Sequence, residues 1–62
     1  MTTYPYAVLC EDTYGEPVEE SWHASGQAAA RKAKQRKVKA PHLNVYVAFN
    51  DRGRWKKIQE VT

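Results

Sequence analysis

The chain has 62 residues, of which 42% are hydrophobic and 27% are charged, a composition that excludes a disordered segment and is typical of a small globular protein. We expect a single domain over residues 1–62, near the lower size limit at which apolar burial alone supports folding. The formal net charge is +3, but residues 1–24 hold five acids and no Lys or Arg, whereas residues 25–62 hold all ten bases and two acids. No apolar run is long enough for a membrane span or a signal peptide core, which predicts a cytoplasmic protein without a membrane partner.

Residues 4–10, YPYAVLC, predict a first strand that begins near Pro5, because proline is tolerated at the start of a strand. The run ends in Cys10, the only cysteine, which excludes an internal disulfide and favours a reducing compartment. We expect Cys10 to act as a small buried hydrophobe and not as a reactive thiol. Residues 11–17, EDTYGEP, combine Asp, Gly and Pro and predict a turn.

Residues 18–23 alternate between two kinds of side chain, which predicts a second strand paired with the first. The alternation places Val18, Glu20 and Trp22 on one face and the residues between them on the other. The predicted hairpin holds the five acids of the first part of the chain: Glu11, Asp12, Glu16, Glu19 and Glu20. It is either a solvated surface or a contact surface for a basic partner, including a second copy of the chain.

Ser25 suits a helix N-cap, and residues 27–39 are almost wholly good helix formers. Pro41 ends the helix, since the residue before a proline is pushed out of helical geometry. One side of the helical wheel carries small residues and one lysine: Gly26, Ala29, Ala30, Ala33, Lys37 and Ala40. Because small side chains permit close approach, we expect this side to lie on a sheet and the opposite side, with Arg31, Lys32, Gln35, Arg36 and Lys39, to face outward. Val38 points away from the small side and is exposed unless the last turn frays.

Residues 43–50, LNVYVAFN, give the strongest strand pattern of the chain. One face carries four apolar residues: Leu43, Val45, Val47 and Phe49. The other face carries Tyr46 and Ala48. Residues 50–53, NDRG, predict a hairpin turn in which Gly53 supplies the positive φ that such loops need.

Residues 54–61 predict the last strand, anchored by Trp55 and Ile58, whose spacing of three indicates a bulge or an early end. The predicted order is β-β-α-β-β, an α+β domain with a four-stranded antiparallel sheet and one helix packed on one face. We expect Trp22 and Phe49 to serve the core. Since one helix covers one face only, the uncovered face is a candidate surface for binding or dimerisation.

Six of the ten bases lie within residues 31–39, a stretch that contains no acid. Like charges on one helix repel each other when no acid lies three or four residues away, so the pattern favours an anionic partner over a merely solvated helix face. Candidate phosphate contacts on the helix and the last hairpin are Arg31, Lys32, Arg36, Lys39, Arg52, Arg54 and Lys56. Tyr46 and Trp55 are candidate sheet-face contacts that could stack on unpaired bases. The pattern predicts nucleic-acid binding and leaves open DNA or RNA, single or double strands.

No motif supplies a catalytic residue, a metal site or a cofactor site. The spacing of Cys10, His23 and His42 is not that of zinc ligands, and the three glycines are isolated, so no phosphate-binding loop is predicted. Glu19 and Glu20 point to opposite faces of a regular strand, which prevents them from acting as a catalytic pair. We therefore expect a binding protein and not an enzyme.

The first 40 residues follow the order of strand, glycine-containing hairpin, aromatic strand end and Ser-capped alanine-rich helix. This order resembles that of small modules of phage and mobile-element proteins, including the arm-site-binding domains of tyrosine-type integrases. The resemblance implies a sheet that approaches DNA, and it assigns no individual residue. Two alternatives remain: a small inhibitor or adaptor that docks on an acidic protein surface, and a structural homodimer joined through the uncovered sheet face.

Overall fold

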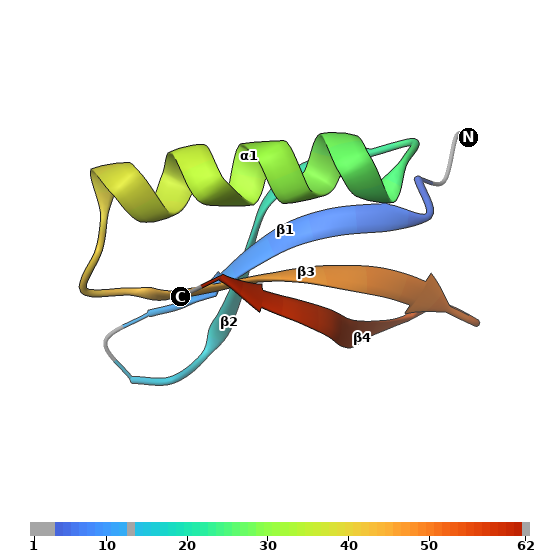
Figure 1. The fold of residues 1–62 in the computed structure, drawn as a ribbon. Helices are drawn as coiled ribbons and strands as arrows, with labels where there is room; N and C mark the ends of the chain where they lie inside the picture. Colours follow the sequence, from blue (N-terminus) through green and yellow to red (C-terminus); the bar gives the residue numbers. More distant parts are fainter. Residues whose placement is uncertain (1–3, 13, 62) are drawn as a thin grey trace.

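The structure is a computed structural model that describes residues 4–12 and 14–61. Its elements, shown in Figure 1, are β1 (Tyr6–Glu11), β2 (Pro17–His23), α1 (Gly26–Lys39), β3 (Asn44–Asp51) and β4 (Arg54–Val61). The strands form one antiparallel sheet in the order β2-β1-β3-β4, and α1 lies across one of its faces (Figure 1). The predicted β-β-α-β-β fold is therefore confirmed.

The helix begins and ends where its sequence predicts. Ser25 has an extended backbone, and its side chain accepts a hydrogen bond of 3.2 Å from the amide of Ala28, as expected of an N-cap. At the other end the amide of Ala40 donates to the carbonyl of Arg36, and the Lys37 ammonium donates to the Leu43 carbonyl at 2.6 Å. The first two contacts satisfy backbone groups at the ends of the helix, and the third ties its last turn to the loop that follows.

The alanine side of α1 packs on the sheet as predicted. Ala29 and Ala33 are fully buried, and with the strands they form one core cluster: Val8, Cys10, Ala29, Ala33, Val45 and Val47. Because alanine has no side chain beyond Cβ, the helix backbone lies close to the strands. Val38 is 81% exposed, in agreement with its predicted direction away from this core.

The uncovered face of the sheet has a small core of its own. Ala7, Leu9 and Ala48 are at most 3% exposed, although no element lies over them. Tyr46 and Trp55 pack against them from the same face. Both faces of the sheet therefore bury apolar surface, and the uncovered one does so with its own side chains.

Strand β2 contains a bulge that changes the predicted faces. Val8 pairs with Ser21 and Leu9 with Glu19, so Glu20 is the extra residue. The expectation that Trp22 shares a face with Val18 and Glu20 is wrong, because the bulge restarts the alternation and places Trp22 on the uncovered face with Glu19.

Strand β4 contains the bulge predicted from its apolar spacing. Val47 pairs with Gln59 and Ala48 with Lys57, which leaves Ile58 as the extra residue. Ile58 is 54% exposed, so the expectation that it anchors the strand is wrong. As the extra residue of the bulge, Ile58 has no cross-strand partner on β3.

A two-residue turn joins β3 to β4, with Asp51 paired to Arg54 across it. Arg52 has φ 56° and Gly53 has φ 86°, and the Gly53 amide donates to the Asn50 side-chain oxygen at 2.8 Å. The predicted positive φ at Gly53 is confirmed. Within residues 4–12 and 14–61, no helix is both long enough and apolar enough to cross a membrane.

Candidate nucleic-acid interface

The bases of α1 lie on two flanks of the helix and not on one outward face. On the flank toward β2, the Arg36 side chain is 34% exposed, and its Nη2 lies 3.3 Å from Oε1 of Glu20. The prediction that Arg36 faces outward is therefore wrong, because the β2 bulge brings Glu20 to the helix. Lys32 and Lys39 lie one helical turn on either side of Arg36 and are exposed on the same flank.

The contact between the acidic hairpin and the helix also involves the thiol. Cys10 is 3% exposed, and its Sγ donates to Glu20 Oε1 at 2.8 Å. Burial, followed by the Glu20 carboxylate, raises the pKa of Cys10 above its ordinary 9.0. The thiol therefore stays protonated at neutral pH, which agrees with the prediction of an unreactive, buried cysteine.

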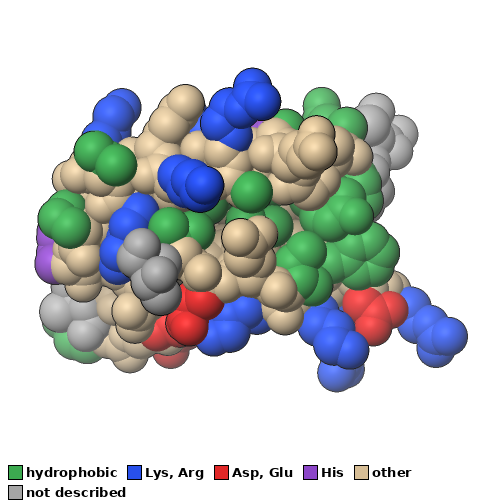
Figure 2. Space-filling model, viewed as in Figure 1, with side chains coloured by type: hydrophobic (Ala, Val, Ile, Leu, Met, Phe, Trp, Pro, Cys, Tyr) green, Lys and Arg blue, Asp and Glu red, His purple; other side chains and the backbone are tan. Residues whose placement is uncertain are grey.

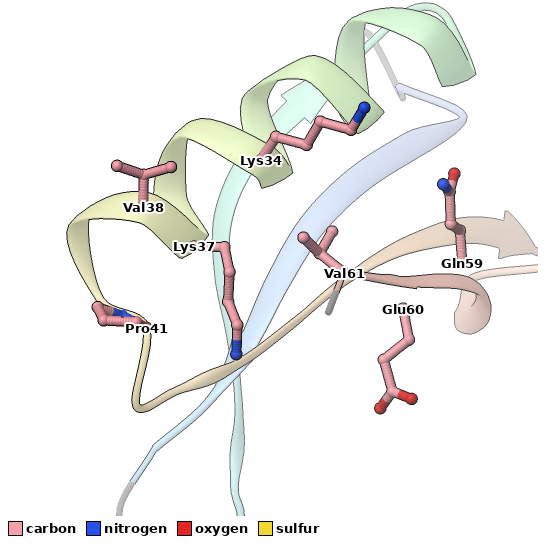
Figure 3. Close-up of a pocket in the computed structure, with 7 residues that line it drawn as sticks. All are labelled: Lys34, Lys37, Val38, Pro41, Gln59, Glu60 and Val61. Carbon is pink, nitrogen blue, oxygen red and sulfur yellow. The ribbon is translucent and has the colours of Figure 1, made fainter.

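On the other flank, α1 and β4 border a hollow that we call the α1–β4 groove. It comprises a space of about 580 Å³ and, beyond Lys34, a second of about 400 Å³. The lining residues are Gln27, Ala30, Arg31, Lys34, Lys37, Val38 and Pro41 on the helix side, and Gln59, Glu60 and Val61 on β4. In Figure 3, Gln59 and Val61 rise from β4 toward α1, whereas the Glu60 side chain points to the opposite face of the sheet. On its β4 side the groove is therefore lined by the side-chain amide of Gln59 and the aliphatic carbons of Val61, and the carboxylate of Glu60 points away from it.

The bases of β4 lie on the helix side of the sheet. Lys56 pairs with Phe49, and Arg54 pairs with Asp51, residues that share the face of Val47 and Val45 beneath α1. Lys56 and Arg54 are both exposed. Arg31 and Lys34 therefore line the helix side of the groove, whereas Lys56 and Arg54 are exposed on the same side of the sheet further along β4 and line neither space. Arg52, in the turn, adds an exposed base at the hairpin end.

Few of these bases have an acidic partner. Among the described residues, the ion pairs within 4.0 Å are Arg36–Glu20 and Lys57–Glu60. Figure 2 shows Lys and Arg side chains over α1 and at the end of the β3–β4 hairpin, with hydrophobic side chains gathered between the two groups. Within the described residues, the acidic hairpin therefore pairs with Arg36 and with no base on the groove side of α1.

The uncovered sheet face carries aromatic side chains and carboxylates where the helix side carries free bases. The indole N–H groups of Trp22 and Trp55, from the two edge strands, both donate to Oε1 of Glu19, at 2.9 and 2.8 Å. Trp22 remains 50% exposed. The predicted sheet-face residues Tyr46 and Trp55 do lie on this face, but beside carboxylates.

The pKa of Tyr46 reflects both its burial and the carboxylates on this face. Burial first, and then the charge of Glu11, raises the pKa of the Tyr46 hydroxyl above its ordinary 10.0, and the nearby Lys57 opposes the shift. The Lys57 ammonium lies 5.3 Å from the centre of the Tyr46 ring and 3.3 Å from Glu60. Lys57 is therefore already engaged, and this face repels phosphate more than it attracts it.

Two residues on the helix side of the sheet escaped the sequence analysis, Lys34 in the groove and Phe49 outside its lining. Lys34 was not among the predicted phosphate contacts, because a helical wheel does not show on which flank of the helix β4 lies. The available signal was that Lys34 shares a helix flank with Gln27 and Ala30. Phe49 was expected in the core, yet it is 38% exposed beside the groove, with its ring centre 5.5 Å from that of Tyr6 at 64°. An alanine helix that begins at Gly26 is too narrow to cover it.

No family model, no curated protein and no solved structure matches the chain. The similarity in element order to phage and mobile-element modules therefore stays a prediction. In the part of the chain that the structure describes, no three His, Cys, Asp or Glu side chains lie together where they could hold a metal ion.

Proposed function

We propose that the chain binds nucleic acid through phosphate contacts along the α1–β4 groove. The observation that carries the proposal is a set of bases on the helix side of the sheet without a carboxylate within 4.0 Å among the described residues: Arg31 and Lys34 at the groove, and Lys56 and Arg54 further along the same face of β4. When such bases contact phosphates, the cations condensed on the nucleic acid are released, which favours binding at low salt.

The geometry changes which residues matter most. Of the predicted phosphate contacts, the proposal keeps Arg31 at the groove, Lys56 and Arg54 on the same side of β4 and Arg52 in the turn, and it adds Lys34. Lys32 and Lys39 lie on the flank toward β2 and contribute only to the long-range field. Arg36 is excluded from direct contact, since breaking its pair with Glu20 would leave a half-buried carboxylate without its partner.

A matched pair of triple variants tests this assignment. Arg31→Gln, Lys34→Gln and Lys56→Gln together remove three charges at the groove and beside it on β4, and Lys32→Gln, Lys39→Gln and Lys57→Gln remove three elsewhere. Affinity for a labelled oligonucleotide is measured by fluorescence anisotropy across a salt series. Because each lost phosphate contact lowers the slope of log affinity against log salt by about 0.7 to 0.9, the groove variant should lose about 2 to 3 from the slope.

The control variant separates a local site from net charge. It carries the same formal charge as the groove variant, but since it removes no direct phosphate contact, it should weaken binding less and change the slope less than the groove variant does. Equal loss in the two variants would show that only net charge matters, and no binding by the unmodified chain at low salt would end the proposal.

A protein partner is the second candidate, favoured by the apolar end of the same groove. Val38 is 81% exposed next to Pro41 and Val61, between the lysines of α1. An acidic peptide with an apolar side chain fits this chemistry. Capture of one partner protein from nuclease-treated extract, together with no oligonucleotide binding, would favour it. A homodimer through the uncovered face stays a prediction, which sedimentation at rising concentration would test.

A further inference from the structure

We propose that the ligand of the α1–β4 groove is single-stranded nucleic acid and that one of its unpaired bases stacks on the exposed ring of Phe49. This inference rests on the proposed function and names its ligand more narrowly. The observations that lead to it are the placement of Phe49, the character of the groove walls and the contrast with the other aromatic residues of the chain.

Phe49 is an aromatic side chain on the side of the sheet that carries the free bases. It stands in one cross-strand row between Tyr6 of β1 and Lys56 of β4. The edge contact with Tyr6, at 5.5 Å and 64°, supports the ring from one side, while 38% of the residue stays exposed. A ring held in this way, with an ammonium group as its neighbour, combines a stacking surface with a phosphate contact.

The position of Tyr6 fixes where this ring lies relative to the helix. The Tyr6 ring lies 3.5 Å from where a Cβ at Gly26 would stand, so Tyr6 fills the space beneath the first turn of α1. Phe49, one strand further toward β4, lies beyond that cover.

The groove offers further contacts to a base and its backbone. Gln59 of β4 lines the larger space and Gln27 of α1 lines the smaller one, and each presents an amide group that can both donate to and accept from base edges. Arg31 and Lys34 lie along the helix wall at the spacing of one turn, where successive phosphates of an extended strand can meet them. Apolar carbon of Val61 and of the lysine stems completes the lining.

A duplex cannot use these features in the same way. Its bases are stacked and paired, so Phe49 could reach a base face only by wedging into the stack, which costs a few kcal/mol per step. An unpaired strand has no such cost, because its bases are free to turn toward an aromatic ring. The groove should therefore discriminate between the two states of the strand.

The other aromatic residues of the chain do not offer this combination. Trp22 and Trp55 use their indole N–H groups on Glu19, and Lys57 beside Tyr46 is paired with Glu60. A strand that stacked there would bring its phosphates to a face rich in carboxylates. Stacking is therefore assigned to the helix side of the sheet, opposite to the face that the sequence favoured.

The first experiment compares strands with the unmodified protein. Affinities for a thymidine oligonucleotide, for the corresponding uridine oligonucleotide and for a duplex of the same length are measured at one salt concentration. We expect at least one of the two single strands to bind about 10-fold more tightly than the duplex. Equal affinities for single strands and duplex would overturn this inference and leave phosphate binding intact, whereas no binding to any of them would overturn both.

The second experiment tests the stacking residue. Phe49→Leu keeps an apolar side chain and removes the ring, and it should weaken single-strand binding about 10-fold with little effect on the duplex. Phe49→Tyr should retain the affinity. Tyr14→Leu, which removes an aromatic residue that is 89% exposed in the acidic hairpin, is the matched control and should change nothing.

A spectroscopic signal makes the result independent of how well the variants fold. A single 2-aminopurine placed in the thymidine strand loses fluorescence when it stacks on an aromatic ring. The unmodified protein and Phe49→Tyr should quench it at saturation, and Phe49→Leu should not. Saturated binding of this strand by the unmodified protein without quenching, at any position of the probe, would overturn the assignment of stacking.

Discussion

The two faces of the sheet bury their apolar side chains in different ways. On the helix side, a separate element with small side chains covers Val8, Val45 and Val47, and the bases lie at the margins of that element. On the uncovered side, Trp22 and Trp55 fold back over the sheet and share one carboxylate. The comparison teaches that a domain of this size can build a basic surface and an acidic surface on the two sides of a single sheet.

The largest expected effect tests whether the uncovered face is a true core. Leu9 is 3% exposed beneath the aromatic residues. Leu9→Ala should lower the free energy of unfolding by about 2 to 5 kcal/mol, as for other buried leucines, because it leaves a cavity. Urea unfolding at low temperature measures it.

Two variants on the helix side make the comparison quantitative. Val47→Ala removes a buried side chain beneath α1, and Val38→Ala removes an exposed one. We expect Val47→Ala, like Leu9→Ala, to lower the free energy of unfolding because it leaves a cavity. Val38→Ala should change the free energy of unfolding by less than about 0.5 kcal/mol. A Leu9→Ala effect as small as that of Val38→Ala would mean that the uncovered face adds no core.

A smaller effect is expected from the carboxylate that holds the indoles. Glu19→Ala removes the acceptor of two hydrogen bonds at once and should cost about 1 to 2 kcal/mol, since both groups also reach water. Glu19→Gln keeps an oxygen in the same place and should cost less. Tryptophan emission should shift to longer wavelength in Glu19→Ala, and an unchanged spectrum would contradict the shared contact.

The smallest expected effect concerns pH and belongs to the helix side. The pKa of Cys10 is raised in the folded chain, so the unfolded chain loses its thiol proton first as the pH rises through 9.0. Stability that is complete below this pH should therefore fall above it. Cys10→Ala should remove this part of the decline and leave the part due to Tyr46, whose pKa is raised from 10.0.

Unfolding of both proteins across the alkaline range gives the difference directly. If the decline near 9.0 were the same with and without the thiol, neither burial nor the contact with Glu20 would raise the pKa of Cys10 in the folded chain.

The comparison of faces also explains which features the sequence could predict. Strict alternation in β3 placed Val47 under the helix and Tyr46 on the other face, and the alanine spacing of α1 identified its packed side. The bulge at Glu20 could not be seen, because a single extra residue leaves the local pattern unchanged while it exchanges the faces that follow. Trp22 and Arg36 were misplaced for this reason.

The site was harder to predict than the fold because it depends on where the strands lie. The sequence gives the bases of α1, but the flank that faces β4 follows from the order β2-β1-β3-β4. Lys34 joins the groove only in that order. Phe49 is a large apolar residue of the kind found in protein cores. Its exposure arises because the narrow alanine helix does not reach over it, and this depends on how distant segments pack.

Both bulges of the sheet lie in its edge strands, at Glu20 in β2 and at Ile58 in β4. A straight edge with unpaired amides and carbonyls invites a strand from another molecule, and an extra residue interrupts that row. The charges at each edge act in the same sense, with Glu16 and Glu19 on β2 or just before it and Lys56 and Lys57 on β4. Two copies that approach by the same edge therefore meet like charges across a kinked row, which disfavours pairing of equal edges. Between β2 of one copy and β4 of another the charges are opposite, so there the two bulges alone interrupt the pairing.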